Sequence, residues 1–213
     1  IARVAAARDA LPSARLKVDA NMGYTLAGAL EALRKLCEYG IIYAEQPVAS
    51  IEDMAALRFA IAKEGLPARI AADESIRKAE DPLKVARANA ADLMVIKAAP
   101  LGGVRRALAL VEQAQLPAVV SSALESSVGI ATGASLAASL PTLRYGCGLG
   151  TVSLMAEDVT DEPLIARDGF MDLRTITPSP QRLERLATDK QTRQWWVERV
   201  TACYRVLERA SGL

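Results

Sequence analysis

The chain has 213 residues, of which 51% are hydrophobic and 24% charged, so it is long and apolar enough to bury one sizeable core. Its 26 Lys and Arg against 25 Asp and Glu exclude a basic field for nucleic acid, and the longest uncharged run, residues 126–143, is too rich in Ser, Thr and Gly for a membrane span. The absence of histidine excludes a Ser-His-Asp triad, histidine zinc sites and any histidine general base.

The first predicted element in chain order is a helix over residues 1–11. Its apolar residues recur at helical spacing on one side, at Val4, Ala7, Ala10 and Leu11. The pattern is that of the later part of a helix, and a half-helix is a poor place to begin a fold. We therefore expect the protein to begin before Ile1, with a processed N-terminus as the alternative.

From residue 15 onward, strand-sized apolar runs alternate with helical patterns. The runs occupy residues 15–21, 41–47, 69–75, 93–99, 117–123 and 143–148. They are rich in Val, Ile or Leu and lack strict alternation, which is typical of parallel strands covered on both faces. Helices are predicted over 25–40, 50–65, 80–92, 101–115 and 126–143, and the second of these begins at a Ser50 cap and ends at Gly65.

Polar residues end five successive runs. They are Asp19, Glu45, Asp73, Lys97 and Ser121, at separations of 26, 28, 24 and 24 residues. Because one β-α unit separates each from the next, all five lie at the carboxyl ends of their strands. A (β/α) barrel gathers these ends around one mouth, where active sites are built, whereas an open doubly wound sheet spreads them along a line. We predict an α/β fold of the TIM-like (β/α) barrel type, with the open sheet as the alternative.

Three of these residues are carboxylates that follow apolar runs directly. Asp19, Glu45 and Asp73 are expected to converge from neighbouring strands on one hard divalent cation, because oxygen donors without His or Cys are typical of Mg²⁺. The cation would compensate charges that a folded interior otherwise rejects. The alternative is that each carboxylate caps the helix that follows it.

Lys97 follows the Val-Ile run of the fourth strand. A lysine beside a dry pocket is a candidate proton acceptor in catalysis. The alternative is an ion pair that neutralises the surplus of carboxylates. The two interpretations are compatible, since a cation also stabilises a neighbouring negative intermediate.

Further polar residues adjoin the predicted ligands. We expect Gln46 and Glu74 to support the ligands from a second shell, and Asn21 to contact ligand or substrate; ordinary turn polarity is the alternative. The glycines of residues 145–150 suggest a phosphate site, but they lack the G-x-G-x-x-G spacing. They are expected to leave room for substrate.

The chain is predicted to divide into a barrel domain, residues 1–178, incomplete at its N-terminus, and a C-terminal helical segment, residues 179–213. Within that segment, residues 191–209 are amphipathic, with an apolar stripe at Trp196, Val200, Cys203, Tyr204 and Leu207. We expect the stripe to pack on a capping domain or the barrel flank, with an interface between copies in a homo-oligomer as the lesser possibility.

The cysteines bear on the compartment. Cys37, Cys147 and Cys203 are scattered without a C-x-x-C pair, and no signal peptide is visible. Reduced thiols and a cytoplasmic protein are therefore expected.

Four short motifs, "VDAN", "EQP", "ADES" and "IKAAPLGG", resemble the successive strand-end signatures of the enolase superfamily, in the same order. Within it, "AADESIRKAEDPL", "VVSSALESSVGIA", "YGCGLGT" and "RQWWVERVTACYRVL" resemble the o-succinylbenzoate synthases of actinobacterial type. The resemblance covers essentially the whole chain. It implies an enolase-superfamily barrel and a lyase that uses Mg²⁺ and a small carboxylate substrate.

The resemblance also implies roles for individual residues. Asp19, Glu45 and Asp73 match the Mg²⁺ ligands, and Lys97 matches a lysine on the sixth barrel strand that places a cation beside an enediolate. Ser121 and Ser122 match residues that help to hold the substrate's succinyl arm; as bare sequence they are equally candidates to cap the helix that opens near residue 126.

The implied reaction is the dehydration of 2-succinyl-6-hydroxy-2,4-cyclohexadiene-1-carboxylate to 2-succinylbenzoate, a step of menaquinone synthesis. The superfamily places a Lys-x-Lys pair, the principal acid and base, on the second barrel strand and adds an N-terminal capping domain. This chain has no counterpart of either, so we expect it to bind metal poorly and to catalyse little by itself. The alternatives are an N-succinylamino acid racemase and a non-catalytic barrel scaffold.

Overall fold

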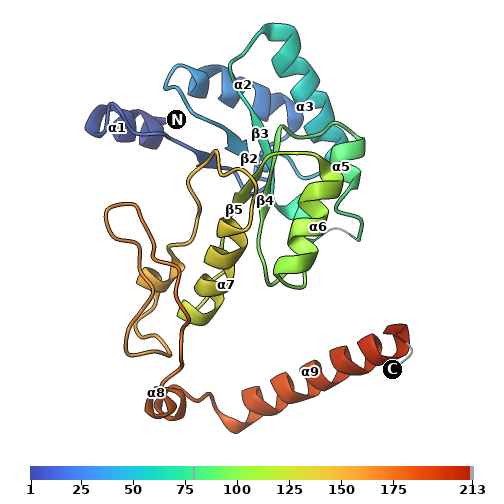
Figure 1. Ribbon diagram of the computed structural model, residues 1–213. Helices are drawn as coiled ribbons and strands as arrows, with labels where there is room; N and C mark the ends of the chain where they lie inside the picture. Colours follow the sequence, from blue (N-terminus) through green and yellow to red (C-terminus); the bar gives the residue numbers. More distant parts are fainter. Residues whose placement is uncertain (79, 212–213) are drawn as a thin grey trace.

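Five short parallel strands form one sheet in the order in which they occur along the chain. They are β1 (Val18–Asp19), β2 (Ala44–Glu45), β3 (Ile70–Ala72), β4 (Leu93–Ile96) and β5 (Ala118–Val120). The computed structural model describes residues 1–78 and 80–211 (Figure 1). A parallel bridge between Ser121 and Gly148 extends the sheet beyond β5.

This strand order distinguishes the two predicted architectures. Each strand pairs with the next one in the chain, as in the register Val18 to Ala44, and the order contains no reversal of the kind found in a doubly wound sheet. Consecutive parallel pairing is the arrangement of (β/α) barrels. The predicted barrel class is therefore confirmed, with the chain forming part of the ring.

Helices connect and follow the strands. Those up to β5 are α1 (Ala2–Ala10), α2 (Leu26–Cys37), α3 (Ile51–Glu64), α4 (Glu74–Arg77), α5 (Lys84–Arg87) and α6 (Val104–Ala114). After β5 come α7 (Ser127–Ala138), a short 3₁₀ helix (Thr151–Leu154), α8 (Pro180–Arg185) and α9 (Lys190–Ser211). The predicted ends of α3 are confirmed, because Ser50 Oγ accepts from the Asp53 amide at 3.0 Å and Gly65 adopts a left-handed φ of 65°.

The two faces of the sheet carry different cores. Even-numbered strand residues such as Ala72, Met94 and Val120 belong to the large apolar core that includes the helices. Odd-numbered residues belong to a small separate cluster on the inner face, formed by Tyr43, Ala71, Leu93, Val95, Val119 and Tyr145. The period of two thus aims residues 19, 45, 97 and 121 toward the inside of the barrel, and Asp73 lies just past the end of β3.

Every predicted strand is shorter in the structure than its apolar run, and three predicted elements also change in other ways. The run 69–75 ends as a strand at Ala72, because Asp73 has helical backbone angles (φ −113°, ψ −72°) and starts α4. The helix predicted over 80–92 is reduced to α5, and the run 143–148 contributes an isolated bridge at Gly148.

The helix α1 forms as predicted, but none of its described side chains is buried. It is attached to the barrel through Arg8, whose guanidinium donates to the carbonyls of Tyr39 at 2.9 Å and of Pro12 and Ala14 at 2.8 Å. This one side chain therefore links α1 to the end of α2 and to the chain that enters β1.

The C-terminal segment ends in α9, which stands apart from the barrel in Figure 1. The apolar residues of its stripe are exposed, among them Trp196, Val200 and Tyr204. Its packing on a capping domain therefore stays a prediction. Within the described residues, no helix combines the length and the apolar character needed to cross a bilayer.

Candidate active site

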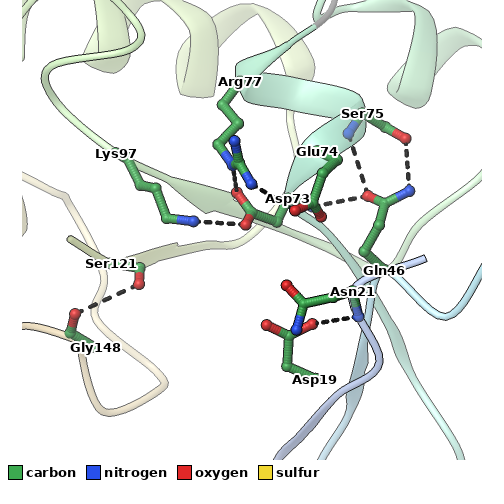
Figure 2. A network of polar contacts seen from close by, with 10 residues as sticks. All are labelled: Asp19, Asn21, Gln46, Asp73, Glu74, Ser75, Arg77, Lys97, Ser121 and Gly148. Atoms are coloured by element: carbon green, nitrogen blue, oxygen red, sulfur yellow. Dashed lines mark hydrogen bonds and ion pairs between the residues drawn. The ribbon is translucent and has the colours of Figure 1, made fainter. Parts of the chain in front are cut away.

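The strand ends bring the predicted acidic residues to one edge of the sheet. Asp19 and Glu45 are register partners in β1 and β2, and Glu45 in turn pairs with Ala71, two residues before Asp73. Lys97 directly follows β4. Figure 2 shows Lys97 and the neighbouring Arg77 both directed at Asp73, with Asp19 close by.

Asp73 is the centre of this network. Its carboxylate is buried and is held on both sides, by Lys97 Nζ at 2.5 Å from Oδ2 and by Arg77 Nε at 3.1 Å from Oδ1. The Lys97 side chain is itself only 12% exposed. The ion pair predicted as one interpretation of Lys97 is therefore present in the structure.

Burial and neighbouring charges raise the pKa of two acids of the site, Glu45 and Asp19. Burial, followed by the charges of Asp19 and Asp73, raises the pKa of Glu45 to about 7, while Lys97 opposes the shift. Burial also raises the pKa of Asp19; the amide of Asn21 opposes this, and the charges of Glu74 and Asp73 add to it. The cluster thus carries more negative charge than its lysine and arginine offset.

The helix-cap interpretation of the carboxylates does not match the contacts. Thr25 and Ser50 are the residues that cap α2 and α3, and Asp19 instead accepts from the Asn21 amide at 2.9 Å in a tight turn. Asp73 occupies the N-cap position of α4, yet within the described chain its side chain makes no capping hydrogen bond.

The fit of a divalent cation can be judged from the donor atoms. In residues 1–78 and 80–211 no three Asp, Glu or Cys side chains are arranged as they stand to hold a metal ion, so the ligand assignment stays a prediction. The donors are nonetheless carboxylate oxygens of the kind Mg²⁺ prefers, and they share an excess of negative charge. Glu74 adds a buried Oε2 atom that has no hydrogen-bond partner in the described structure. By donor type and by charge, the residues fit a Mg²⁺ ion.

The side chain of Gln46 supports this site by binding the backbone around Asp73. Its fully buried amide accepts from the amides of Asp73 at 3.0 Å and Ser75 at 3.2 Å, and donates to Val48 O at 3.0 Å and Ser75 Oγ at 2.8 Å. Gln46 therefore holds the turn that leads from β3 into α4. Its role in supporting the predicted ligand Asp73 from a second shell stays a prediction.

The two serines after β5 join the last strand to the segment that follows. Ser122 Oγ donates to Gly148 O at 2.9 Å and Ser121 Oγ to the same oxygen at 3.4 Å. The first turn of α7 is held by another residue, Asp158, which accepts from the Ser127 amide at 3.1 Å. The helix-cap interpretation of the two serines is therefore wrong.

Sequence reasoning missed two cations of the site. Lys17 and Asp19 line the same inner cavity of about 110 Å³, and Lys17 Nζ donates to Gly146 O at 2.8 Å. The signal was its position two residues before Asp19, on the same side of a strand. Arg77 stands three residues after Glu74 and four after Asp73, which is the spacing of neighbours on a helix. The apolar run 69–75 predicts a strand there, and a strand does not bring residues at this spacing together.

Comparison with known proteins gives close relatives. The chain is 50% identical over 208 residues to a protein of Mycolicibacterium smegmatis named o-succinylbenzoate synthase, covering 97% of this chain and 62% of the relative. It is 49% identical over 213 residues to the protein of the same name from Mycobacterium tuberculosis, covering 100% of this chain and 63% of that one. The chain thus spans less than two thirds of the length of these relatives.

Solved structures agree on the architecture. The muconate lactonizing enzyme from Pseudomonas fluorescens, complexed with muconolactone, superposes with a TM-score of 0.76 at 31% identity, over 86% of this chain and 51% of that one. Residues 1–178 match the family described as Enolase C-terminal domain-like. This match covers the strands, the strand-end acids and Lys97. The chain belongs to the Enolase C-terminal domain-like family.

Proposed function

We propose that the chain is the barrel portion of a Mg²⁺-dependent o-succinylbenzoate synthase. This hydro-lyase converts 2-succinyl-6-hydroxy-2,4-cyclohexadiene-1-carboxylate to 2-succinylbenzoate in menaquinone biosynthesis. Support comes from two relatives of that name at 50% and 49% identity over nearly the whole chain. We also propose a cytoplasmic location, consistent with three free cysteines at positions 37, 147 and 203.

One observation carries the proposal: the contact between Lys97 and Asp73. Lys97 Nζ lies 2.5 Å from Asp73 Oδ2 at the strand ends where Glu45 and Asp19 also lie, and both side chains are largely buried. A buried ammonium beside a group of carboxylates concentrates opposite charges in a small volume. Such an arrangement suits a reaction in which negative charge develops on a substrate carboxylate.

The residues have distinct roles in this proposal. Asp19, Glu45 and Asp73 would hold Mg²⁺, which when bound supplies Lewis-acid stabilisation of the substrate carboxylate. Lys97 keeps a positive charge where the substrate becomes more negative as its α-proton leaves. Gln46 fixes the backbone of Asp73, and Ser121, which lines the inner cavity, would contact the substrate's succinyl arm.

The 213 residues contain no Lys-x-Lys pair, so the step that removes the α-proton is not assigned to a residue of this chain. Lys17 lines the inner cavity, and its Nζ already donates a hydrogen bond to Gly146 O at 2.8 Å. The proposed activity is therefore that of a full-length protein such as the relatives, of which this chain spans 62–63%. We expect the chain alone to dehydrate substrate slowly.

The test is a dehydration assay of the full-length protein with Mg²⁺ or EDTA. Lys97→Ala should lower kcat by roughly 100- to 1000-fold, because it removes one preorganised charge at the reacting group. Lys84→Ala is the matched control, since Lys84 also forms an ion pair, with Glu52 at 2.9 Å, but on the exposed outer surface.

Turnover only of an N-succinylamino acid would instead favour the racemase. Activity that survives both EDTA and Lys97→Ala would contradict the proposed mechanism. The absence of turnover with either substrate, together with no effect of Mg²⁺ on stability, would favour the scaffold.

A further inference from the structure

Arg77 donates hydrogen bonds to two neighbouring carboxylates, to one oxygen of each. Its Nε lies 3.1 Å from Asp73 Oδ1, and its Nη2 lies 2.5 Å from Glu74 Oε1. The contacts are well shielded, because the Asp73 and Glu74 side chains are 3% and 6% exposed and Arg77 is 25% exposed. Figure 2 shows the guanidinium above both acids, on the side away from Asp19.

The second oxygen of each carboxylate is not the one that Arg77 contacts. Asp73 Oδ2 is contacted by Lys97, whereas Glu74 Oε2 is buried and has no hydrogen-bond partner in the described residues. A buried carboxylate oxygen without a donor is costly, because it has lost water and gained nothing in exchange. Figure 2 shows Glu74 beside Asp73, on the side of the network where Asn21 and Asp19 lie.

We propose that Arg77 is a positioning residue that occupies one oxygen each of Asp73 and Glu74 and turns the other oxygen of each toward the cation. This inference rests on the proposed Mg²⁺-dependent function. Asp73 Oδ2, which also contacts Lys97, would then be the oxygen offered to the ion, and Glu74 Oε2 would accept a hydrogen bond from ion-bound water. Mg²⁺ suits this division because it loses its waters reluctantly and keeps several of them in protein sites.

A purely structural role for Arg77 predicts something different. If the side chain only neutralised two buried charges, any cation of similar reach would do. Lysine keeps the charge but lacks the planar fork that binds two acceptors in fixed directions. Arg77→Lys therefore separates charge compensation from the selection of oxygens.

The experiment measures Mn²⁺ binding to the full-length protein, as a probe for Mg²⁺, by electron paramagnetic resonance of the free ion. We expect Arg77→Lys to weaken binding by about 10- to 100-fold, the usual effect of losing a residue that orients a ligand. Arg34→Lys is the matched control, because Arg34 makes a comparable two-bonded pair with Glu64 on the outer surface. Wild-type affinity in Arg77→Lys, or an equal loss in Arg34→Lys, would overturn the proposal.

Thermal unfolding of each variant in EDTA accompanies the titration. If Arg77→Lys does not fold, Glu74→Gln replaces it, since this change keeps the shape of the side chain and removes the acceptor charge. The same 10- to 100-fold loss is expected there. Unchanged Mn²⁺ affinity in Glu74→Gln would contradict the role given to Oε2.

A second readout separates this inference from the proposed function. In the metal-free full-length protein, the Nε–H of Arg77 should exchange with water more slowly in NMR spectra than that of the exposed Arg105. Wild-type protein that binds no Mn²⁺ but shows a protected Arg77 Nε–H would refute the metal function and leave the positioning contact intact. An unprotected Arg77 Nε–H would overturn the positioning role in either case.

Discussion

Gln46 is the residue on which the geometry around Asp73 depends. It is fully buried, and its side-chain oxygen is the acceptor for the amides of Asp73 and Ser75. Its own backbone has a positive φ of 34°, an unfavourable conformation for a residue with a side chain. The network therefore accepts local strain in order to satisfy the buried amides at the start of α4.

Replacing Gln46 with Leu should destabilise the protein by roughly 2–4 kcal/mol, since two buried amides lose their acceptor at once. Urea unfolding followed by circular dichroism measures the change. Gln194→Leu on α9, where the glutamine contacts Glu198 at an exposed site, should change stability little. Equal changes in the free energy of unfolding for the two substitutions would show that the buried hydrogen bonds of Gln46 add no more stability than an exposed contact.

The cysteines should react at different rates with a thiol reagent such as DTNB. Burial raises the pKa of both Cys37 and Cys147 above the ordinary value of 9.0, so at pH 8 their thiolate fractions are lowered. Cys203 is exposed on α9. We expect one fast thiol, lost in Cys203→Ser, and two slow thiols whose rates continue to rise with pH above 9.0.

The sign of this pH effect also applies to stability. Because the folded-state pKa values of Cys37 and Cys147 are raised by burial, folding favours the neutral thiols, and this contribution is lost as the pH rises through the folded-state values. Three equally fast thiols in the native protein would contradict the burial of these two side chains.

At the scale of elements, the strand-end residues were predictable and the first turn of α4 was not. The period of about 25 residues reflects a repeated β-α unit, so it survives without knowledge of packing. The turn at Asp73 depends on Gln46, which is 27 residues away in sequence, and local pattern carries no trace of that contact. The ion pair of Asp73 with Lys97 likewise joins separate strands, so only the fold reveals which oxygen each cation takes.

The attachment of α1 can be tested at the same scale. Arg8→Ala should accelerate amide hydrogen exchange across residues 2–10 while leaving the barrel's exchange unchanged, because Arg8 supplies the hydrogen bonds from α1 to Tyr39 O. Arg3→Ala, an exposed position on the same helix, is the control. Equal protection of α1 in both variants would mean that apolar packing, and not Arg8, holds the helix.

At the scale of the whole molecule, the two tryptophans report on a single helix. Both Trp195 and Trp196 lie on α9, and they are 51% and 53% exposed. Tryptophan fluorescence should therefore be readily quenched by acrylamide, and its thermal transition should not coincide with that of the barrel followed by circular dichroism. Shielded tryptophans and a single shared transition would show that α9 is packed against another surface in solution.

The neighbour-to-neighbour pairing of the sheet has a consequence for biosynthesis. Val18 pairs with Ala44 and Ala71 pairs with Leu93, which lie 26 and 22 positions further along the chain. Each of these strands therefore pairs with one that follows it closely in sequence. A nascent polypeptide leaving the ribosome can thus add strands in the order of translation. No early strand among these five has to stay unpaired until a distant one is synthesised. The strand-end acids Asp19, Glu45 and Asp73 would be placed in that same order, and Lys97, which pairs with Asp73, would follow them.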